Sequence, residues 1–379
     1  MSKDRWNIGI VGGGPGGLFT AYRLEQLCST PPIISIFEAS SRLGGKLLTE
    51  QFSIKDFQYE AGAAEFYDYS LIDEDPLREL VEHFGLPIQP MGGASVVQDK
   101  KIIGTLEDVH DILGDTAFDE FIRFNNRAKS EVSPRQFYDG TPTSHIELQN
   151  STLSEDRFSK TIDQLPTEVK NYVGQQIHSD LAAEPHQTSH RYGLDNFLMN
   201  DPAYMQLYCI TGGNDLLANA ITSRLSANIY LHTEVTAVCK TGQNTMQLSY
   251  STEGRHVCEE FDAVILALPI EPLKEIVFSG SELQSVMEKH ITHHDHPANY
   301  LRITILFEKP FWKSWLQDSY CMLDAFDGCC LYDESSRTPG ARHGVLGWLL
   351  GGTAAKKMAG QNDKELIAAA LESLPFHNK

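Results

Sequence analysis

The sequence predicts an α/β fold of two lobes, and its amino-terminal segment supplies the main observations. An apolar run at residues 8–11 leads into a glycine-rich turn at 12–17, and a second apolar run at 33–37 ends at the acid Glu38. The gap between the two runs is long enough for a helix. Strand, glycine turn, helix and strand in this order are typical of a parallel, doubly wound sheet. The 379 residues are also enough for two lobes.

The glycine turn predicts a Rossmann-like dinucleotide site. Gly12, Gly14 and Gly17 form a GxGxxG pattern, in which the first glycine allows a tight turn and the second lets backbone approach a pyrophosphate. The third lets helix and strand pack closely, and the amino end of the helix then faces the phosphates with unpaired N–H groups. Glu38 stands where a ribose hydroxyl is expected. The cofactor-binding residues predicted from this unit are Gly12, Gly14, Pro15, Gly16, Gly17, Glu38 and Ala39.

A second glycine motif indicates which dinucleotide is bound. Residues 42–46 have the sequence Arg-Leu-Gly-Gly-Lys, and residues 59–63 have the sequence Tyr-Glu-Ala-Gly-Ala. With the glycine turn, they resemble the flavin-containing amine oxidoreductase superfamily, which includes amine and L-amino-acid oxidases, polyamine oxidases, protoporphyrinogen oxidase and the carotene desaturases. The resemblance implies an FAD cofactor, with the Arg-x-Gly-Gly loop over its pyrophosphate and the Gly-Ala pair beside its flavin ring. It adds Arg42, Gly44, Gly45, Lys46, Gly62 and Ala63 to the predicted cofactor-binding residues.

The rest of the chain predicts that the FAD-binding lobe is discontinuous. We expect residues 1–95 and 205–285 to form this lobe, and residues 96–204 and 286–379 to form a substrate lobe with a mixed or antiparallel sheet and a helical cap. By resemblance, the backbone of Val235 meets the adenine. The residue patterns predict helices at 75–86, 111–128, 162–181, 216–225 and 363–374, a hairpin at 96–103, strands at 228–232, 234–240, 246–250, 261–269 and 344–352, and a loop at 139–159.

Two residues are the candidates for a catalytic role. In the amine oxidases that the chain resembles, a lysine ten residues before the tryptophan of a Phe-Trp pair holds a water against the flavin, and this chain has Arg302 there. Three roles are open to Arg302: holding a water or a positive charge near the flavin, binding an anionic group of a substrate, or forming a structural ion pair. Glu65 stands where L-amino-acid oxidases offer an arginine. The Glu65 carboxylate there favours a substrate with a cationic group over one with an α-carboxylate. An equal alternative is that Glu65 is a surface acid or a partner for Arg302.

Composition narrows the classes of partner. The 51 acidic and 31 basic residues give a formal net charge of −20, which repels nucleic acid and anionic membrane surfaces. The sequence has no apolar run of membrane-spanning length, and its polar start is unlike a signal peptide. The seven cysteines form no CxxC pair, so we expect reduced thiols and a cytoplasmic protein. The histidine-rich segment 293–296 is expected to be a solvated linker and not a metal site.

The sequence therefore predicts an FAD-dependent oxidoreductase that oxidises a C–N bond of an amine-type small molecule, by hydride transfer to flavin with oxygen as acceptor. The alternatives are a desaturase or isomerase acting on C–C bonds and a non-catalytic flavoprotein. The family's last glycine-rich segment, which closes over the FAD, has no counterpart in the sequence. This leaves open a shorter fold variant, a truncated chain, or a split enzyme completed by a second polypeptide. A homo-oligomer is a further expectation.

Overall fold

The fold is described by a computed structural model that covers residues 5–53, 57–93, 95–140, 157–242, 245–337, 340 and 342–375. The chain divides into two compact units. Unit 1 contains residues 1–50, 60–64 and 212–297, and unit 2 contains residues 51–59, 65–211 and 298–379. The predicted loop at 139–159 lies largely outside the described residues. In the described part of the chain, no helix combines the length and apolar character needed to span a membrane.

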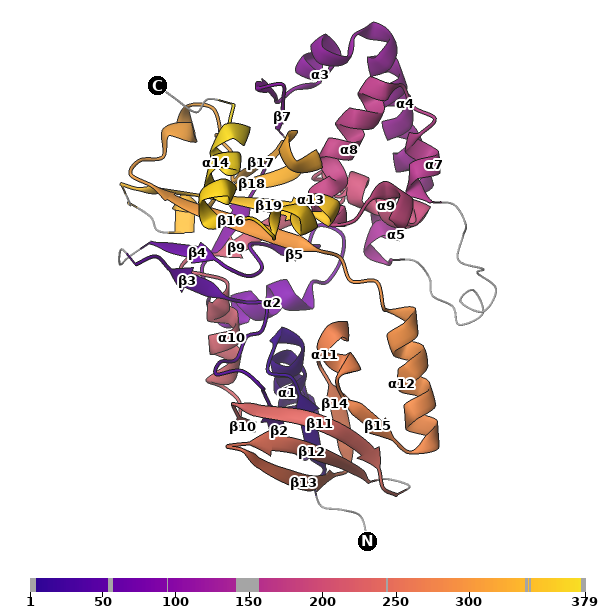
Figure 1. The fold of residues 1–379 in the computed structure, drawn as a ribbon, viewed down its shortest axis with the longest axis vertical. Coiled ribbons are helices and arrows are strands. Elements are labelled where there is room, and N and C mark those ends of the chain that lie inside the picture. Colours follow the sequence, from indigo (N-terminus) through magenta and orange to yellow (C-terminus); the bar gives the residue numbers. More distant parts are fainter. Residues whose placement is uncertain are drawn as a thin grey trace. The chain divides into compact units, whose positions relative to one another are not determined.

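Unit 1 is built around a parallel sheet with the strand order β10-β2-β1-β14 (Figure 1). Its central strand β1 (Asn7–Val11) is almost wholly buried and leads directly into α1 (Pro15–Leu27). The buried face of α1 contributes Leu18, Ala21 and Tyr22, so the apolar stripe of this helix packs inside the unit. The other elements of the sheet are β2 (Ile33–Phe37), β10 (Asn228–Tyr230) and β14 (Ala263–Leu266). This arrangement confirms the predicted α/β class.

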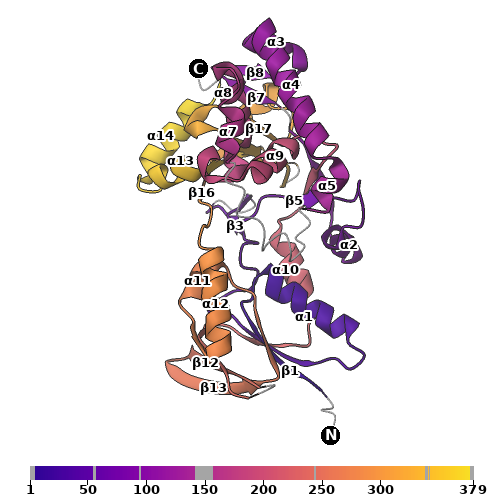
Figure 2. The ribbon, with the colours of Figure 1, turned by 90° about the vertical axis from the view of Figure 1, so that its right-hand side faces the viewer.

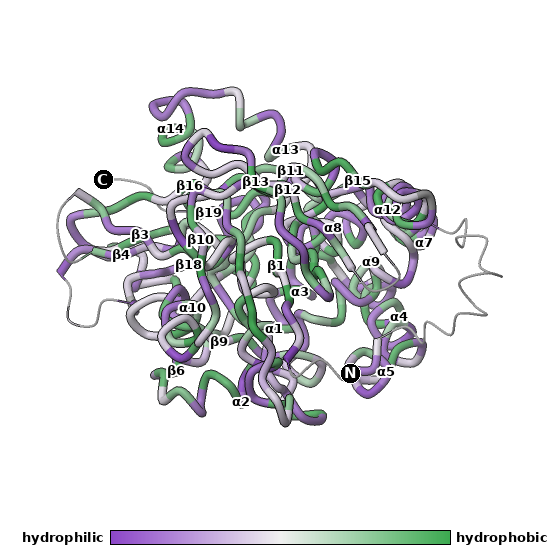
Figure 3. The backbone as a smooth tube through the Cα atoms, turned by 90° about the horizontal axis from the view of Figure 1, so that it is seen from below, coloured by the Kyte–Doolittle hydropathy of each residue, from purple (hydrophilic) through white to green (hydrophobic). Residues whose placement is uncertain are grey.

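A second sheet, with the order β13-β12-β11-β15, packs against the parallel sheet. Val11 and Phe37 of the first sheet share one hydrophobic cluster with Leu248 and Phe261 of the second. Figure 2 shows α1 on the side of the parallel sheet opposite to α11 and α12, and Figure 3 colours most of α12 as hydrophilic. The second sheet and the other helices of unit 1 consist of α10 (Asp215–Thr222), β11 (Thr233–Lys240), β12 (Met246–Thr252), β13 (Arg255–Phe261), α11 (Ile270–Lys274), β15 (Val277–Ser279) and α12 (Ser281–His293).

Unit 2 contains a six-stranded mixed sheet with the order β16-β19-β18-β17-β7-β8, in which only the β17–β7 pair is parallel. Trp312 and Trp348 are completely buried in its core. The long helix α8 lies along the sheet, because its Gln175 amide and Ser179 hydroxyl donate to backbone carbonyls of strands β7 and β19. The strands are β7 (Val96–Gln98), β8 (Lys101–Ile103), β16 (Tyr300–Phe307), β17 (Tyr320–Leu323), β18 (Cys329–Asp333) and β19 (Gly344–Gly351).

The remaining elements of unit 2 are a small antiparallel sheet, β5-β9-β6, and the helices around it. The sheet consists of β5 (Phe66–Asp68), β6 (Ile88–Met91) and β9 (Gln206–Ile210), and the helices are α2 (Pro76–His83), α3 (Leu106–Leu113), α4 (Asp115–Glu131), α5 (Pro134–Tyr138), α7 (Phe158–Ile162), α8 (Thr167–Leu181), α9 (His190–Leu198), α13 (Gly352–Met358) and α14 (Asp363–Ser373). Short 3-10 turns lie at Pro185–Gln187, Phe311–Ser314, Ala325–Asp327 and Glu334–Arg337. Strands β3 (Thr49–Gln51) and β4 (Gln58–Glu60) pair with each other at the unit boundary.

The observed units have boundaries different from those expected of the two lobes. Residues 65–95, which the sequence assigned to the FAD-binding lobe, group with unit 2. Strand β9, which pairs with β5 and β6 and was expected in the same lobe, groups with unit 2 as well. The physical reason is backbone hydrogen bonding to unit 2, because the Ser319 and Met322 N–H groups donate to carbonyls of residues 92 and 95. The helix expected at 111–128 is two helices, α3 and α4, which meet at Gly114 with a φ of 74°. No strand was predicted at β13. Its charged residues interrupt the alternation of apolar and polar side chains that indicates a strand.

Candidate functional site

Unit 1 contains a crevice of about 680 Å³ at the carboxyl ends of its parallel strands. Strand β1 delivers the glycine turn to this edge, and β2 delivers Glu38 beside it. This is the edge at which ligands bind in doubly wound sheets. The predicted cofactor-binding residues that line the crevice are Gly12, Gly14, Pro15, Gly16, Glu38, Ala39, Gly45, Lys46 and Val235.

The glycines of the turn fall into two groups according to what a side chain would meet. A Cβ atom at Gly17 would lie 2.0 Å from the Gly12 carbonyl oxygen, and one at Gly12 would lie 2.5 Å from the Ala267 carbonyl oxygen. These two glycines are therefore required by packing within the protein. At Gly14 the only neighbour within reach is a Cα atom at 3.8 Å, and at Gly16 there is none within 4 Å.

Gly14 is the stronger indication of a ligand. Its φ of −75° and ψ of −178° suit any residue, so neither backbone conformation nor packing requires a glycine there. A side chain at this position would project into the crevice, at the amino end of α1 where N–H groups lack helical partners. The space therefore fits a pyrophosphate that lies against bare backbone.

Glu38 is held in place by two backbone donors. Its Oε2 atom accepts a hydrogen bond from the Gly13 N–H at 2.8 Å, and its Oε1 atom accepts one from the Ser40 N–H at 2.9 Å. Each carboxylate oxygen has a second lone pair, so the group can still accept from a ribose hydroxyl. The structure thus places Glu38 at the crevice as the sequence predicted, and its ligand contact stays a prediction.

The Arg42 loop is braced against the glycine turn. The Gly44 N–H donates to the Gly13 carbonyl at 2.9 Å, and Arg42 Nη2 donates to the Gly45 carbonyl at 2.8 Å. Arg42 and Gly44 do not line the crevice, whereas Gly45 and Lys46 do. Arg42 therefore shapes the loop, and Lys46 is the cation of this motif that lines the crevice.

Gly62 and Ala63 are joined to the same loop. A Cβ atom at Gly62 would lie 1.9 Å from the Lys46 carbonyl oxygen, and the Ala63 N–H donates to that oxygen at 2.9 Å. The buried Asn214 amide donates to the Ala63 carbonyl at 2.9 Å. The Asn214 side chain makes no capping bond to α10, although it stands at the start of that helix. Asn214 instead fixes the Gly62–Ala63 segment.

Val235 borders the crevice at an irregular point of its strand. The pairing of β11 with β12 shifts register between Val235 and Ala237, so Thr236 is an extra residue in the ladder. Such a bulge interrupts regular backbone pairing. This geometry is compatible with the backbone contact that the family resemblance implies for Val235.

Unit 2 contains a second, much smaller cavity of about 20 Å³ with two acids in its wall. Glu65 precedes β5, and Asp180 lies in the last turn of α8. Aromatic and sulfur-containing side chains complete the wall, among them Tyr67, Tyr320, Tyr332, Met322 and Cys330. We call this cavity the acidic pocket.

Both acids are less acidic than ordinary carboxyl groups. Burial raises the pKa of Glu65, against the opposing effects of Arg302 and of a hydrogen bond with Tyr332. The Glu65 Oε2 atom is buried and has no hydrogen-bond partner among the described residues. Burial and the charge of Glu65 raise the pKa of Asp180 to about 7. Across the described residues, no ion pair involves Asp180, and the Coulomb interaction that shifts its pKa is with Glu65, another acid.

Arg302 forms an ion pair with Glu334. The Arg302 Nη2 atom donates to Glu334, and the two side chains are 10% and 1% exposed. The guanidinium also lies over the Tyr332 ring, 5.1 Å from its centroid. Of the three roles open to Arg302, the structure contains the ion pair, and its charge also acts on Glu65. A direct catalytic role of Arg302 stays a prediction.

Sequence reasoning missed Asp180 and Tyr332. A negative charge in the last turn of a helix is unfavourable, because the helix dipole is negative there. This unfavourable position of Asp180 was the one feature of the sequence that could have indicated a functional role. Tyr332 had no signal, because its neighbours in space come from distant segments. All seven cysteines lie in the described part of the chain, and none of them forms a disulfide there. Among the described residues, no three His, Cys, Asp or Glu side chains are grouped in a way that could hold a metal ion.

Comparisons with known proteins identify the family of the chain. The family model described as flavin-containing amine oxidoreductase matches residues 15–376. Achacin of Lissachatina fulica is 31% identical over 90 residues, a match that spans 21% of this chain and 16% of achacin. The chain thus covers only a small part of the length of this curated relative.

Solved structures show the same fold at low sequence identity. A cofactor-site variant of putrescine oxidase aligns with a TM-score of 0.74 and 18% identity, over 97% of this chain and 80% of the other. Cyclohexylamine oxidase from Brevibacterium oxydans IH-35A aligns with a TM-score of 0.70 and 16% identity over the same shares. The family match covers nearly the whole chain, and the bare backbone at Gly14 fits a pyrophosphate. The chain belongs to the flavin-containing amine oxidoreductases and is an oxidoreductase with FAD as its cofactor.

Proposed function

We propose that this protein oxidises a C–N bond of a cationic amine, and that Glu65 and Asp180 receive the substrate's ammonium group. The observation that carries the proposal is the acidic pocket, where two acids face one small cavity. Oxygen is the proposed final electron acceptor. The alignments with putrescine oxidase and cyclohexylamine oxidase support an amine as the substrate.

The electrostatics of the pocket favour a cation. Asp180 stands at the carboxyl end of α8, where the helix dipole is negative, and Glu65 adds a second negative charge. Both effects, together with burial, penalise the ionised carboxylates. An ammonium group between them would remove this penalty, whereas a substrate carboxylate would increase it.

Arg302 does not offset this preference. Its guanidinium is hydrogen-bonded to Glu334, a buried acid that lies between Arg302 and Arg337. An α-carboxylate would therefore have to displace a buried acid in order to reach the guanidinium. A neutral hydrocarbon substrate, as a C–C desaturase would need, leaves both acids without a cation.

The two acids can also account for the proton that leaves the substrate in the reaction. Oxidation of an amine to an imine removes a hydride from carbon and a proton from nitrogen. FAD, when bound, supplies the acceptor for the hydride. A carboxyl group with a pKa of about 7, as at Asp180, can accept the proton of a bound ammonium near neutral pH. Glu65 then keeps the nitrogen in place, with its own carboxyl group oriented by Tyr332.

Flavin reduction by defined substrates tests this proposal. The purified protein is mixed under anaerobic conditions with primary amines, secondary amines and polyamines, and in parallel with unsaturation substrates of C–C desaturases. We expect amines alone to bleach the flavin absorbance and, in air, to release peroxide. Bleaching by a C–C substrate with no response to any amine would contradict the proposal.

A further inference from the structure

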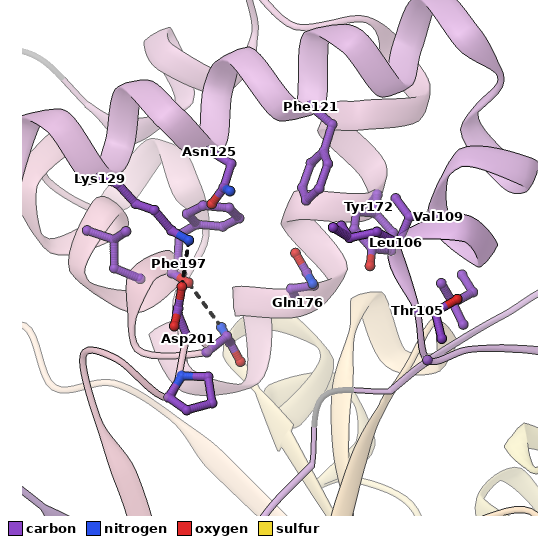
Figure 4. Close-up of a pocket in the computed structure, with 15 residues that line it drawn as sticks. Thr105, Leu106, Val109, Phe121, Asn125, Lys129, Tyr172, Gln176, Phe197 and Asp201 are labelled. Carbon is purple, nitrogen blue, oxygen red and sulfur yellow. Dashed lines mark hydrogen bonds and ion pairs between the residues drawn. The ribbon is translucent and has the colours of Figure 1, made fainter.

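A cavity of about 360 Å³ lies in the helical part of unit 2 and has no part in the proposed function. Its walls come from the start of α3 and from α4, α8 and α9 (Figure 4). The volume is within the range of sites that hold small organic molecules. We call it the cap pocket.

Two helices line the cap pocket with the same pattern. Phe121 and Asn125 are four residues apart on α4, and Tyr172 and Gln176 are four residues apart on α8. This spacing places each pair on one face of its helix. Figure 4 shows Phe121 and Asn125 extending from α4 toward the open space, with Gln176 extending toward it from the opposite wall. Each helix therefore offers one aromatic ring and one carboxamide.

Three hydrogen-bonding groups that α4 and α8 present to this cavity have no partner among the described residues, whereas the Asn200 amide, also in the wall, donates to backbone carbonyls of α9. The Gln176 Oε1 atom is buried and has no partner among the described residues. In the same part of the chain, neither the Asn125 amide nor the Tyr172 hydroxyl has a hydrogen bond. Burial raises the pKa of Tyr172 to about 12, so its hydroxyl keeps its proton. Buried polar groups without partners cost free energy, which a ligand that pairs with them recovers.

The cap pocket carries no uncompensated charge. Lys129 and Asp201 are the charged residues in its wall, and they form an ion pair with a distance of 2.6 Å between Nζ and Oδ2. Figure 4 shows this pair at one end of the cavity. A charged ligand would therefore lose its hydration without gaining a counter-ion.

We propose that the cap pocket binds an uncharged planar molecule that carries an amide-type group, with donor and acceptor side by side. Gln176 and Asn125 pair with the amide, and the Phe121 ring packs against the plane of the ligand. The acidic pocket prefers a cation, so the two pockets select opposite kinds of molecule, although Asn200 lines both.

Three probes that share one ring and differ in charge test the proposal: benzamide, benzoate and benzyltrimethylammonium. Calorimetric titration of the FAD-loaded protein measures the affinity of each. Gln176→Leu and Asn125→Leu remove one carboxamide each, and Phe121→Trp places a larger ring where the ligand is expected to pack. Asn126→Leu is the matched control, because Asn126 is exposed on the same helix.

We expect benzamide to bind, with an affinity that falls roughly tenfold in Gln176→Leu and is unchanged in Asn126→Leu. Phe121→Trp should abolish binding while FAD content and melting temperature stay at the wild-type values. Benzamide binding that survives both Gln176→Leu and Phe121→Trp would overturn the proposal. Absence of benzamide binding at millimolar concentration, or equal sensitivity of benzoate binding to Gln176→Leu, would overturn it as well. None of these readouts depends on turnover, so the test is independent of the proposed amine oxidation.

Discussion

The crevice of unit 1 and the acidic pocket of unit 2 are built in different ways. The phosphate-facing part of the crevice is bare backbone from glycines that lie close together in the sequence, and residues 233–236 and 267–276 complete its wall. The acidic pocket is formed by side chains that come from β5, α8, β17 and β18 and from the segment before β5. A site made of backbone is constrained by local spacing, whereas a site made of side chains depends on which segments the fold brings together. The first can therefore be predicted from local sequence, whereas the second becomes visible only in the fold.

Substitutions in the glycine turn give the largest expected effects, and they separate folding from FAD binding. In Gly17→Ala the new Cβ meets the Gly12 carbonyl, so we expect a loss of about 4 kcal/mol or more in the free energy of unfolding. Gly14→Ala should fold normally, because only open crevice surrounds the new methyl group. Its affinity for FAD should fall roughly a hundredfold, since backbone can no longer approach the pyrophosphate.

Denaturant unfolding and FAD titration measure the two effects. Gly174→Ala is the control, because no atom lies within 4 Å of a Cβ there and the position is far along the sequence in α8. Normal FAD affinity in Gly14→Ala would mean that the pyrophosphate does not lie against this residue.

Removal of the two carboxylates should leave FAD binding intact and abolish most of the activity. We expect Glu65→Gln and Asp180→Asn together to lower kcat/KM for the best amine by about a thousandfold, through loss of the cation site and of the proton acceptor. Steady-state peroxide release measures this change, and the flavin spectrum verifies cofactor content. Asp163→Asn is a matched control, because Asp163 is an exposed acid paired with Lys170.

Arg302 should prove to be mainly structural. Arg302→Gln leaves Glu334 buried without this partner, so we expect about 3 kcal/mol of destabilisation. Arg302→Lys keeps the charge and should lose less stability. Thermal melts of both variants, with kcat measured on the folded fraction, distinguish a structural role of Arg302 from a catalytic one. A variant with wild-type stability and no activity would instead assign Arg302 a direct catalytic role.

A further expected effect is on the pH dependence of stability. The pKa of Asp180 is raised to about 7, so the folded state binds its proton more tightly than the unfolded state does. The stability contributed by this proton is present at low pH and is lost as pH rises from about 4 to about 7. Between these limits the wild type should lose roughly 4 kcal/mol that Asp180→Asn keeps. Melting curves across this range compare the two proteins, and equal slopes would rule out the raised pKa.

The sequence was sufficient to predict the parallel sheet, the glycine turn and the position of Glu38, because each depends on neighbours along the chain. A family resemblance also marked the positions of Glu65 and Arg302, whose catalytic roles stay predictions. The sequence did not identify Asp180 or Asn214, because their roles arise from contacts with distant segments. The expected lobe boundaries differ from the units for the same reason, since the backbone hydrogen bonds from residues 319 and 322 to residues 92 and 95 are not visible in local patterns. The second polypeptide and the cytoplasmic location stay predictions.

Rapid-mixing measurement of flavin reduction under anaerobic conditions tests the central claim most directly. The wild type and Glu65→Gln/Asp180→Asn are compared, each loaded with FAD, against the same series of amine concentrations. The account predicts fast, saturable bleaching in the wild type and a rate lower by about a thousandfold in the variant, at equal FAD content. Equal bleaching rates in the two proteins would contradict the assignment of the two acids as the amine site.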